Sequence, residues 1–281
     1  MKFLIFGSKG QLGREFVDRL KNTDHTFTAY DIDEKDVTDR SLVVRTVKEE
    51  KPDVLINCAA YNLVDKAEEF AEPAFVANAD AVEYMAEVCA ENGILMVHYS
   101  SDYVFDGKMD FAQYEEIDRC NPLGQYGKSK LAGEANVREI CDDYLVFRLS
   151  WIYGKGDRNF IHKFLGWAKE NQELKIANDE TSVPTSVETV VDITLLAIEK
   201  NLRGLYHLTN SGYCTRFQWA EQIVKTMDLS NTLVPVSKDS FDLKAPRPPY
   251  SAMSNKKISD ALGIEIPEWD VMVDKYLKNL S

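Results

Sequence analysis

The sequence predicts an α/β fold in which a doubly wound parallel sheet is joined by a smaller mixed α/β lobe. Two observations predict it. Short apolar runs alternate with helical patterns through the first half of the 281 residues, and this regularity loosens after about residue 150. Strands that alternate with helices form right-handed βαβ units, whose parallel sheet is covered on both faces. We therefore expect domains at 1–150 and 151–281, with some segments of the second returning to the first.

The elements of the first domain follow from apolar spacing and turn residues. Pro52 precedes the third strand, and Gly93 ends a long Ala-rich helix whose apolar residues recur at helical spacing. A loop rich in Asp, Gly and Pro is expected from Ser101 to about Gln125. The expected strands are Lys2–Phe6, Thr26–Tyr30, Asp53–Asn57, Ile94–Tyr99 and Tyr144–Leu149, and the expected helices are Gln11–Leu20, Arg40–Glu50, Pro73–Glu91 and Tyr126–Cys141.

The second half is less regular and contains a Pro-dense stretch at 245–250. Its patterns indicate a smaller mixed lobe that packs closely on the first domain. The expected helices are Phe160–Glu170, Val187–Lys200, Phe217–Met227 and Val271–Leu280, and Gly204–Thr209 is an expected strand.

Composition and charge exclude several classes of protein. With 33 basic and 46 acidic side chains, the formal net charge is −13, which argues against a nucleic-acid-binding protein because phosphate contacts need clustered Lys and Arg. No apolar run approaches the roughly 18–20 residues of a membrane helix, so no membrane partner is expected. Five widely spaced cysteines, without a CxxC pair, indicate a reduced protein and a cytoplasmic location.

Gly7, Gly10 and Gly13 lie between the first expected strand and the first expected helix. Glycines there allow a tight turn and a close backbone approach, and the helix N-terminus offers free N–H groups to a pyrophosphate. An ordinary Gly-rich turn is the alternative for three glycines taken alone. Their position after an N-terminal strand favours a Rossmann-type dinucleotide site.

Asp31 bears on the choice of dinucleotide. It ends the second expected strand, 18 residues after Gly13, where a carboxylate can bind ribose hydroxyls. Lys9 and Arg14 could instead neutralise a 2′-phosphate. We therefore expect the protein to use both NADH and NADPH.

Tyr126 and Lys130 are four residues apart and share one face of an expected helix. A phenol with a pKa of about 10 is a poor acid or base at neutral pH, and a nearby ammonium lowers that value. An exposed pair on an amphipathic helix is the alternative. Ser101 lies just after the fourth expected strand, at the sheet edge where ligands bind, and could hydrogen-bond the substrate oxygen that Tyr126 protonates.

Together the glycines, the serine and the YxxxK motif resemble the extended short-chain dehydrogenase/reductases, and among them reductases of a dTDP-linked 4-keto-6-deoxyhexose. The resemblance covers nearly the whole chain. The matching segments are 10–15 (GQLGRE), 57–61 (NCAAY), 64–68 (VDKAE), 100–107 (SSDYVFDG), 126–130 (YGKSK) and 151–154 (WIYG). It implies NAD(P)H-dependent reduction of the C4 keto group of dTDP-4-dehydro-L-rhamnose to dTDP-L-rhamnose.

The resemblance also implies a role for each matched residue. Tyr126 is the proton donor, Lys130 holds the nicotinamide ribose and tunes Tyr126, and Ser101 is the third catalytic residue. Ser101, Asp102 and Tyr126 contact the sugar, and Trp151 closes over it. The cofactor contacts are Gly10, Gln11 and Leu12 in the turn from Gly7 to Gly13, Asp31 at the adenosine ribose, Asp36 and Val37 at the adenine, and Ala59, Ala60 and Tyr61 after the third strand.

Some positions depart from the family pattern and leave alternatives open. Ser101 stands where Thr is usual, Asn62 where Thr is usual, and Glu180 where Gln is usual. Another nucleotide-linked 4-keto sugar, or an epimerase or dehydratase reaction, remains an alternative, as does a non-catalytic regulatory subunit like that of methionine adenosyltransferase. The four histidines lack metal-ligand spacing, so no metal is expected. A monomer and a homodimer are both compatible with the sequence.

Overall fold

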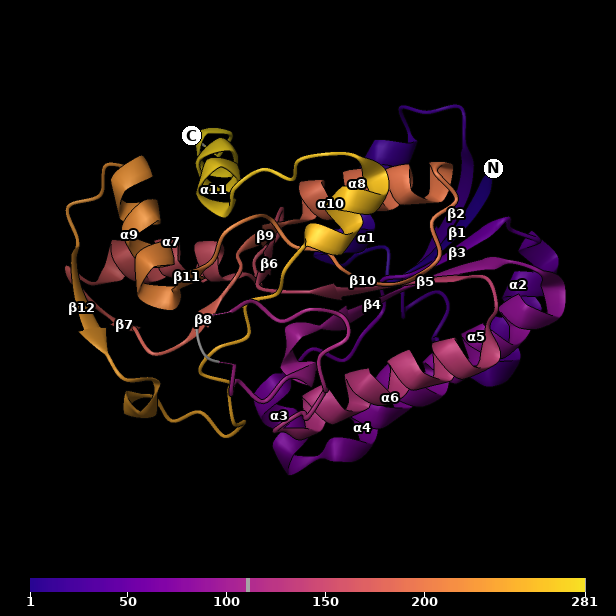
Figure 1. Ribbon diagram of the computed structural model, residues 1–281, viewed down its shortest axis with the longest axis horizontal. Helices are drawn as coiled ribbons and strands as arrows, with labels where there is room; N and C mark the ends of the chain where they lie inside the picture. Colours follow the sequence, from indigo (N-terminus) through magenta and orange to yellow (C-terminus); the bar gives the residue numbers. More distant parts are fainter. Residues whose placement is uncertain (110–111, 281) are drawn as a thin grey trace.

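A computed structural model describes residues 1–109 and 112–280; positions 110, 111 and 281 of the expected loop and second lobe lie outside this part. At its centre is a six-stranded parallel sheet in the order β10-β5-β4-β3-β1-β2 (Figure 1). The strands are β1 (Lys2–Phe6), β2 (Thr26–Tyr30), β3 (Val54–Asn57), β4 (Leu95–Ser101), β5 (Tyr144–Leu149) and β10 (Gly204–His207). The strand order reverses between β1 and β3, which creates a ligand-binding crevice at their carboxyl ends. The predicted fold class is confirmed.

Helices cover both faces of this sheet and form two apolar cores with it. One core joins the sheet to α1 (Gln11–Leu20), α8 (Val187–Glu199) and α10 (Lys256–Leu262). The other joins it to α2 (Arg40–Glu50), α5 (Ala81–Asn92) and α6 (Gln125–Ile140). Buried on both faces, the central strands have continuous apolar sequences, as parallel strands usually do.

The expected helix Pro73–Glu91 is interrupted by a wider turn. It consists of α4 (Ala71–Phe75), a π-helical turn η1 (Val76–Asp80) and α5, and a short helix α3 (Val64–Glu69) that was not predicted precedes it. π turns inside α-helices frequently occur at functional sites. This turn faces α6, the helix that carries Tyr126 and Lys130.

The second lobe has its own core, at the opposite end of the molecule from α2 (Figure 1). Its helices are α7 (Phe160–Glu170), α9 (Arg216–Thr226) and α11 (Trp269–Lys278). Its strands pair in twos: β7 (Glu173–Ala177) with β12 (Thr232–Val236), β6 (Ile152–Tyr153) with β9 (Thr185–Ser186), and β8 (Thr181–Ser182) with β11 (Cys214–Thr215). The 3₁₀ turns η2 (Asp102–Val104) and η3 (Lys238–Ser240) lie in connecting loops.

The chain crosses between the two parts more than once. After leaving β5 it returns to the first sheet through α8, β10 and α10, and then ends in the second lobe with α11. The division at residue 150 stays a prediction, with these returning segments assigned to the first domain. Among the described residues, no helix has both the length and the apolar character needed to cross a membrane.

Candidate active site at the carboxyl end of the sheet

The turn from β1 to α1 depends on its glycines. Gly7 has a φ of +78°, and a Cβ added there would lie 2.6 Å from the backbone nitrogen of Ala59. A Cβ on Gly13 would lie 2.2 Å from the carbonyl oxygen of Gly7. Gly10 is the N-cap of α1, so the free N–H groups of Gln11 and Leu12 begin the helix at the crevice. The turn therefore fits the predicted pyrophosphate cradle.

Asp31 ties the end of β2 to this glycine turn. Its Oδ2 accepts a hydrogen bond of 2.6 Å from the backbone N–H of Lys9, and its Oδ1 accepts one of 2.9 Å from Ile32. The side chain of Lys9, expected to be available for a 2′-phosphate, is paired with Asp33 at 2.5 Å. The Asp31 carboxylate therefore lies beside the glycine turn. Lys9, one of the two cations that could favour NADPH, is already paired with Asp33.

Other expected cofactor residues follow β2 and β3. Asp36 accepts hydrogen bonds from the backbone and hydroxyl of Thr38 at 2.9 and 2.8 Å, and Val37 packs against the core next to α2. After β3, Ala59 donates its N–H to Asn57 at 3.0 Å. Ala60 and Tyr61 continue the chain along the edge of the crevice.

Asn78, which the sequence reasoning missed, connects this loop to helix α6. It is fully buried in the π turn, accepts the Tyr61 N–H at 2.8 Å and donates to the Tyr61 carbonyl at 3.0 Å. It also donates to the Ser129 hydroxyl at 3.0 Å, and Ser129 donates to the Tyr126 carbonyl at 2.8 Å. A lone Asn within an Ala-rich helix was the available signal for this buried polar link.

Tyr126 lies in the first turn of α6, close to Ser101. Its hydroxyl donates to Asn62 Oδ1 at 3.2 Å, and its ring meets the Tyr103 ring edge-on with centroids 5.7 Å apart. Burial raises the pKa of Tyr126 to about 12, although a hydrogen bond with Ser101 opposes the shift. The predicted lowering of this pKa is therefore wrong in this structure, because burial and the nearby charge of Asp102 raise the pKa more than the Ser101 hydrogen bond lowers it.

Lys130 lies one turn further along α6 and is 2% exposed. Its Nζ donates to the carbonyl oxygen of Tyr99 at 2.6 Å. Burial lowers the pKa of Lys130 to about 8, against the attraction of Glu134. The two residues of the motif are thus a protonated phenol and a buried ammonium near the end of β4.

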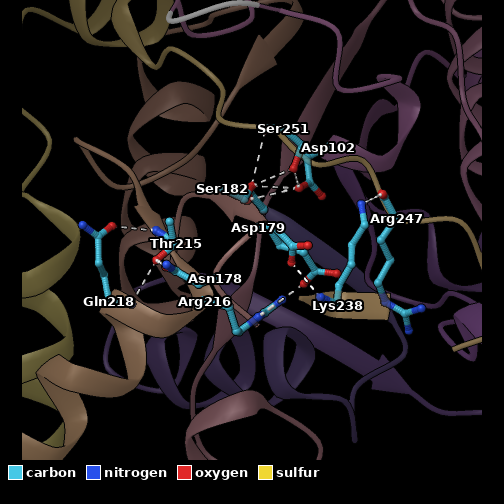
Figure 2. A network of polar contacts seen from close by, with 12 residues as sticks. Asp102, Asn178, Asp179, Ser182, Thr215, Arg216, Gln218, Lys238, Arg247 and Ser251 are labelled. Atoms are coloured by element: carbon cyan, nitrogen blue, oxygen red, sulfur yellow. Dashed lines mark hydrogen bonds and ion pairs between the residues drawn. The ribbon is translucent and has the colours of Figure 1, made fainter. Parts of the chain in front are cut away.

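Asp102 directly follows Ser101, and its carboxylate accepts hydrogen bonds from serine hydroxyls. Its Oδ2 accepts from Ser251 at 2.6 Å and Ser182 at 2.9 Å (Figure 2). Oδ2 also accepts from Ser150 at 3.4 Å, and Oδ1 accepts from Ser101 at 3.1 Å. Burial raises the pKa of Asp102, and these hydroxyls oppose that shift. The observed contacts hold Ser101 in place, while contact of Asp102 with a sugar stays a prediction.

Trp151 stands where the chain enters the second lobe, with a φ of +39°. This left-handed conformation is rare for a bulky residue and points to a functional constraint. The indole stacks on Trp219 with centroids 5.7 Å apart, and the guanidinium of Arg216 lies 3.6 Å from the Trp151 centroid. The half-buried ring therefore brings an aromatic surface and a cation to the junction of the lobes.

Glu68 lies on α3 and is partly exposed. Its Oε1 accepts a 2.6 Å hydrogen bond from the backbone N–H of Gln125, at the start of α6. Asp65, one turn earlier in α3, forms an ion pair with Arg247 at 2.8 Å. The two carboxylates of the VDKAE segment are thus engaged with distant parts of the chain.

Comparison with known proteins shows the family to which the chain belongs. Residues 1–281 match the family model described as the RmlD substrate binding domain. The dTDP-4-dehydrorhamnose reductase of Burkholderia thailandensis is 34% identical, with 100% of this chain and 99% of that protein covered. The crystal structure of a dTDP-4-dehydrorhamnose reductase from Clostridium acetobutylicum superposes with a TM-score of 0.96 at 33% identity, covering 100% and 99% of the two chains.

A third similar protein was solved with a nucleotide. It is the dTDP-4-dehydrorhamnose reductase of Bacillus anthracis in complex with NADP, with a TM-score of 0.95, 32% identity and 99% of each chain covered. The family match spans the whole chain and the relatives are covered almost completely. The chain therefore belongs to the RmlD substrate binding domain family.

Proposed function

We propose that this protein reduces the C4 keto group of dTDP-4-dehydro-L-rhamnose with NADPH or NADH, giving dTDP-L-rhamnose. The single observation that carries the proposal is the grouping of Ser101, Tyr126 and Lys130 at the same carboxyl edge of the parallel sheet as the glycine turn. The full-length relatives named dTDP-4-dehydrorhamnose reductase support the substrate, and the relative solved with NADP supports the cofactor.

The residues of the crevice would hold the cofactor between β1 and β3. The turn from Gly7 to Gly13, including Gly10, Gln11 and Leu12, would take the pyrophosphate. Asp31 would bind the adenosine ribose, with Asp36 and Val37 at the adenine and Ala59, Ala60 and Tyr61 along the opposite side. When bound, the nicotinamide supplies the hydride for the keto carbon.

Tyr126 would give the proton. Because its pKa lies near 12, its phenol stays protonated at neutral pH and can donate to the oxygen that becomes negative at C4. Ser101 would hydrogen-bond the same oxygen by turning its one hydroxyl hydrogen from Asp102, its acceptor in this structure, toward the substrate. Lys130 would hold the nicotinamide ribose while its ammonium adds positive potential near the developing charge.

The second lobe would hold the sugar nucleotide. Trp151 offers an aromatic surface for the deoxysugar. Arg216 and Arg247 both lie close enough to Tyr103 to lower its pKa, although the larger effect of burial raises that pKa. Lys238 donates a hydrogen bond of 2.9 Å to the Arg247 carbonyl (Figure 2). In a chain of net charge −13, this local group of cations suits a diphosphate.

The proposal also covers the domain division, the cellular location and the oligomeric state. We propose residues 1–150 as the dinucleotide-binding domain and 151–281 as the substrate-binding lobe. The five free cysteines suit the reducing cytoplasm, and we propose a monomer or homodimer acting there.

The test is an NADPH oxidation assay with two matched ketosugars, dTDP-4-dehydro-L-rhamnose and its unepimerised precursor, dTDP-4-dehydro-6-deoxy-D-glucose. We expect rapid oxidation with the first, slower oxidation with the second, and dTDP-L-rhamnose as the product by NMR. Preference for the second sugar would overturn the substrate assignment. Cofactor binding without oxidation of either would favour the non-catalytic alternative.

A further inference from the structure

The helix that carries Tyr126 takes its N-terminal cap from another helix. The N-cap residue of α6 is Gly124, whose backbone is extended and which has no side chain to offer. Helices α7, α8 and α9 are capped by their own Asn159, Ser186 and Thr215. At α6 the partner for the first N–H is Glu68 Oε1, 2.6 Å from the nitrogen of Gln125 and 57 residues away in sequence.

The fit between Glu68 and this helix end is close. A Cβ added to Gly124 would lie 2.4 Å from Glu68 Oε1, with Pro246 the next neighbour at 3.4 Å. Glycine at this position therefore leaves room for the carboxylate. A carboxylate here also interacts favourably with the positive end of the helix dipole.

The helix that supplies Glu68 is itself attached to the second lobe. Asp65 lies three residues earlier in α3, so the two side chains are neighbours along the helix. Asp65 accepts hydrogen bonds from both terminal nitrogens of Arg247, at 3.1 and 2.8 Å, and from the N–H of Ala245 at 3.0 Å. In Figure 1, α3 lies at the N-terminal end of α6, where it can hold that end in place.

We propose that Glu68 is a positioning residue for the reduction: its carboxylate fixes the first turn of α6 and thereby places the Tyr126 hydroxyl beside Ser101. The inference rests on the proposed function. Tyr126 follows the capped Gln125 directly, in the turn whose N–H groups lack helical partners. A misplacement of about 1 Å at a reacting group can lower turnover about 100-fold.

The first test separates positioning from binding. For Glu68→Ala we expect kcat to fall about 10- to 100-fold, with KM for the sugar nucleotide and Kd for NADPH changed less than about threefold. Glu68→Gln keeps an oxygen acceptor and should retain kcat within about threefold. Glu72→Ala removes an exposed carboxylate from the following helix and should behave as wild type.

The second test uses the contact with Gly124. Gly124→Ala should lower kcat in the wild-type protein, because its methyl group displaces the carboxylate, but have little further effect in the Glu68→Ala background. This non-additivity is the expected sign of two residues that act through one contact.

Two results would overturn the inference. One is a Glu68→Ala protein with kcat near wild type, whether or not its melting temperature falls. The other is full additivity of Glu68→Ala and Gly124→Ala in kcat. Failure of the proposed function would be distinct, because the wild-type protein itself would then not reduce dTDP-4-dehydro-L-rhamnose.

Discussion

The ammonium nitrogen of Lys130 lies 2.6 Å from the carbonyl oxygen of Tyr99, one helical turn beyond Tyr126. This contact anchors helix α6 to strand β4, whose last residue is Ser101. The positions of the Lys130 ammonium and the Tyr126 phenol are therefore set by the sheet. We expect Tyr126 to donate a proton and Lys130 to supply positive charge.

Tyr126→Phe should reduce turnover by about 100- to 10,000-fold, since the variant lacks the proton donor. NADPH affinity should change little, because only one hydroxyl is removed. Stopped-flow turnover and fluorescence titration of NADPH measure the two quantities. Tyr84→Phe, which removes a phenolic hydroxyl from helix α5, is the control, and near-normal turnover of Tyr126→Phe would show that another group donates the proton.

Activity should fall as the pH rises through about 8. The pKa of Lys130 is lowered to about 8, so its ammonium is present below that pH and lost above it, whereas Tyr126, with a pKa of about 12, keeps its proton throughout. A profile of kcat/KM against pH measures this. Lys130→Met should have a low turnover that does not fall further as the pH rises through about 8. A wild-type profile that stays flat to about pH 10 would contradict the role given to the Lys130 ammonium.

Asp31→Ala should shift cofactor preference toward NADPH, because it removes a carboxylate that favours an unmodified ribose. The ratio of kcat/KM for NADPH to that for NADH is the measurement. Asp31→Asn serves as the control, since its side-chain oxygen can still accept the hydrogen bond from Lys9 while the charge is lost. Unchanged ratios in both variants would remove Asp31 from the ribose site.

Trp151→Ala should raise KM for the sugar nucleotide and leave NADPH affinity nearly unchanged. Because the ring is half-buried, the loss in free energy of unfolding should be smaller than the about 3–5 kcal/mol expected for a buried Trp. Urea unfolding and steady-state kinetics measure both effects, with the exposed Trp167→Ala as the control. A large loss of stability with normal KM would show that Trp151 is a core residue only.

Glu134→Ala should lower the free energy of unfolding by about 3–5 kcal/mol, because it leaves the guanidinium of Arg148 buried without its partner. The two side chains are 1% and 2% exposed, lie 2.8 Å apart and join helix α6 to strand β5. Urea denaturation measures the loss, and Glu139→Ala, exposed on the same helix, should be neutral. A loss below about 1 kcal/mol would mean that water reaches the charge in the variant.

Most of the first domain could be predicted because its elements are coded locally. Apolar runs and turn residues predicted Thr26–Tyr30 and Arg40–Glu50 with the observed bounds. The pairing of β7 with β12 could not be predicted, since both strands are short and the paired residues Glu173 and Thr232 are 59 positions apart (232 − 173). Their pairing depends on how the second lobe packs.

In the candidate site, too, local features could be predicted from the sequence and long-range contacts could not. Ser101, Tyr126 and Lys130 follow from strand ends and helical spacing, which are visible in the sequence. The contacts of Glu68 with Gln125 and of Asn78 with Tyr61 join segments far apart in the chain, so they emerged only with the fold. The pKa of Tyr126 was misjudged because burial, the dominant effect, is a property of the folded protein.

The central claim is hydride transfer to C4 of the sugar. NADPH labelled with deuterium at both hydrogens on C4 of the nicotinamide, turned over with dTDP-4-dehydro-L-rhamnose, tests it most directly. The account predicts one deuterium per product molecule, located by NMR at C4 of dTDP-L-rhamnose, with one NADP⁺ formed for each product. Product without deuterium at C4, or formed without net oxidation of NADPH, would contradict it.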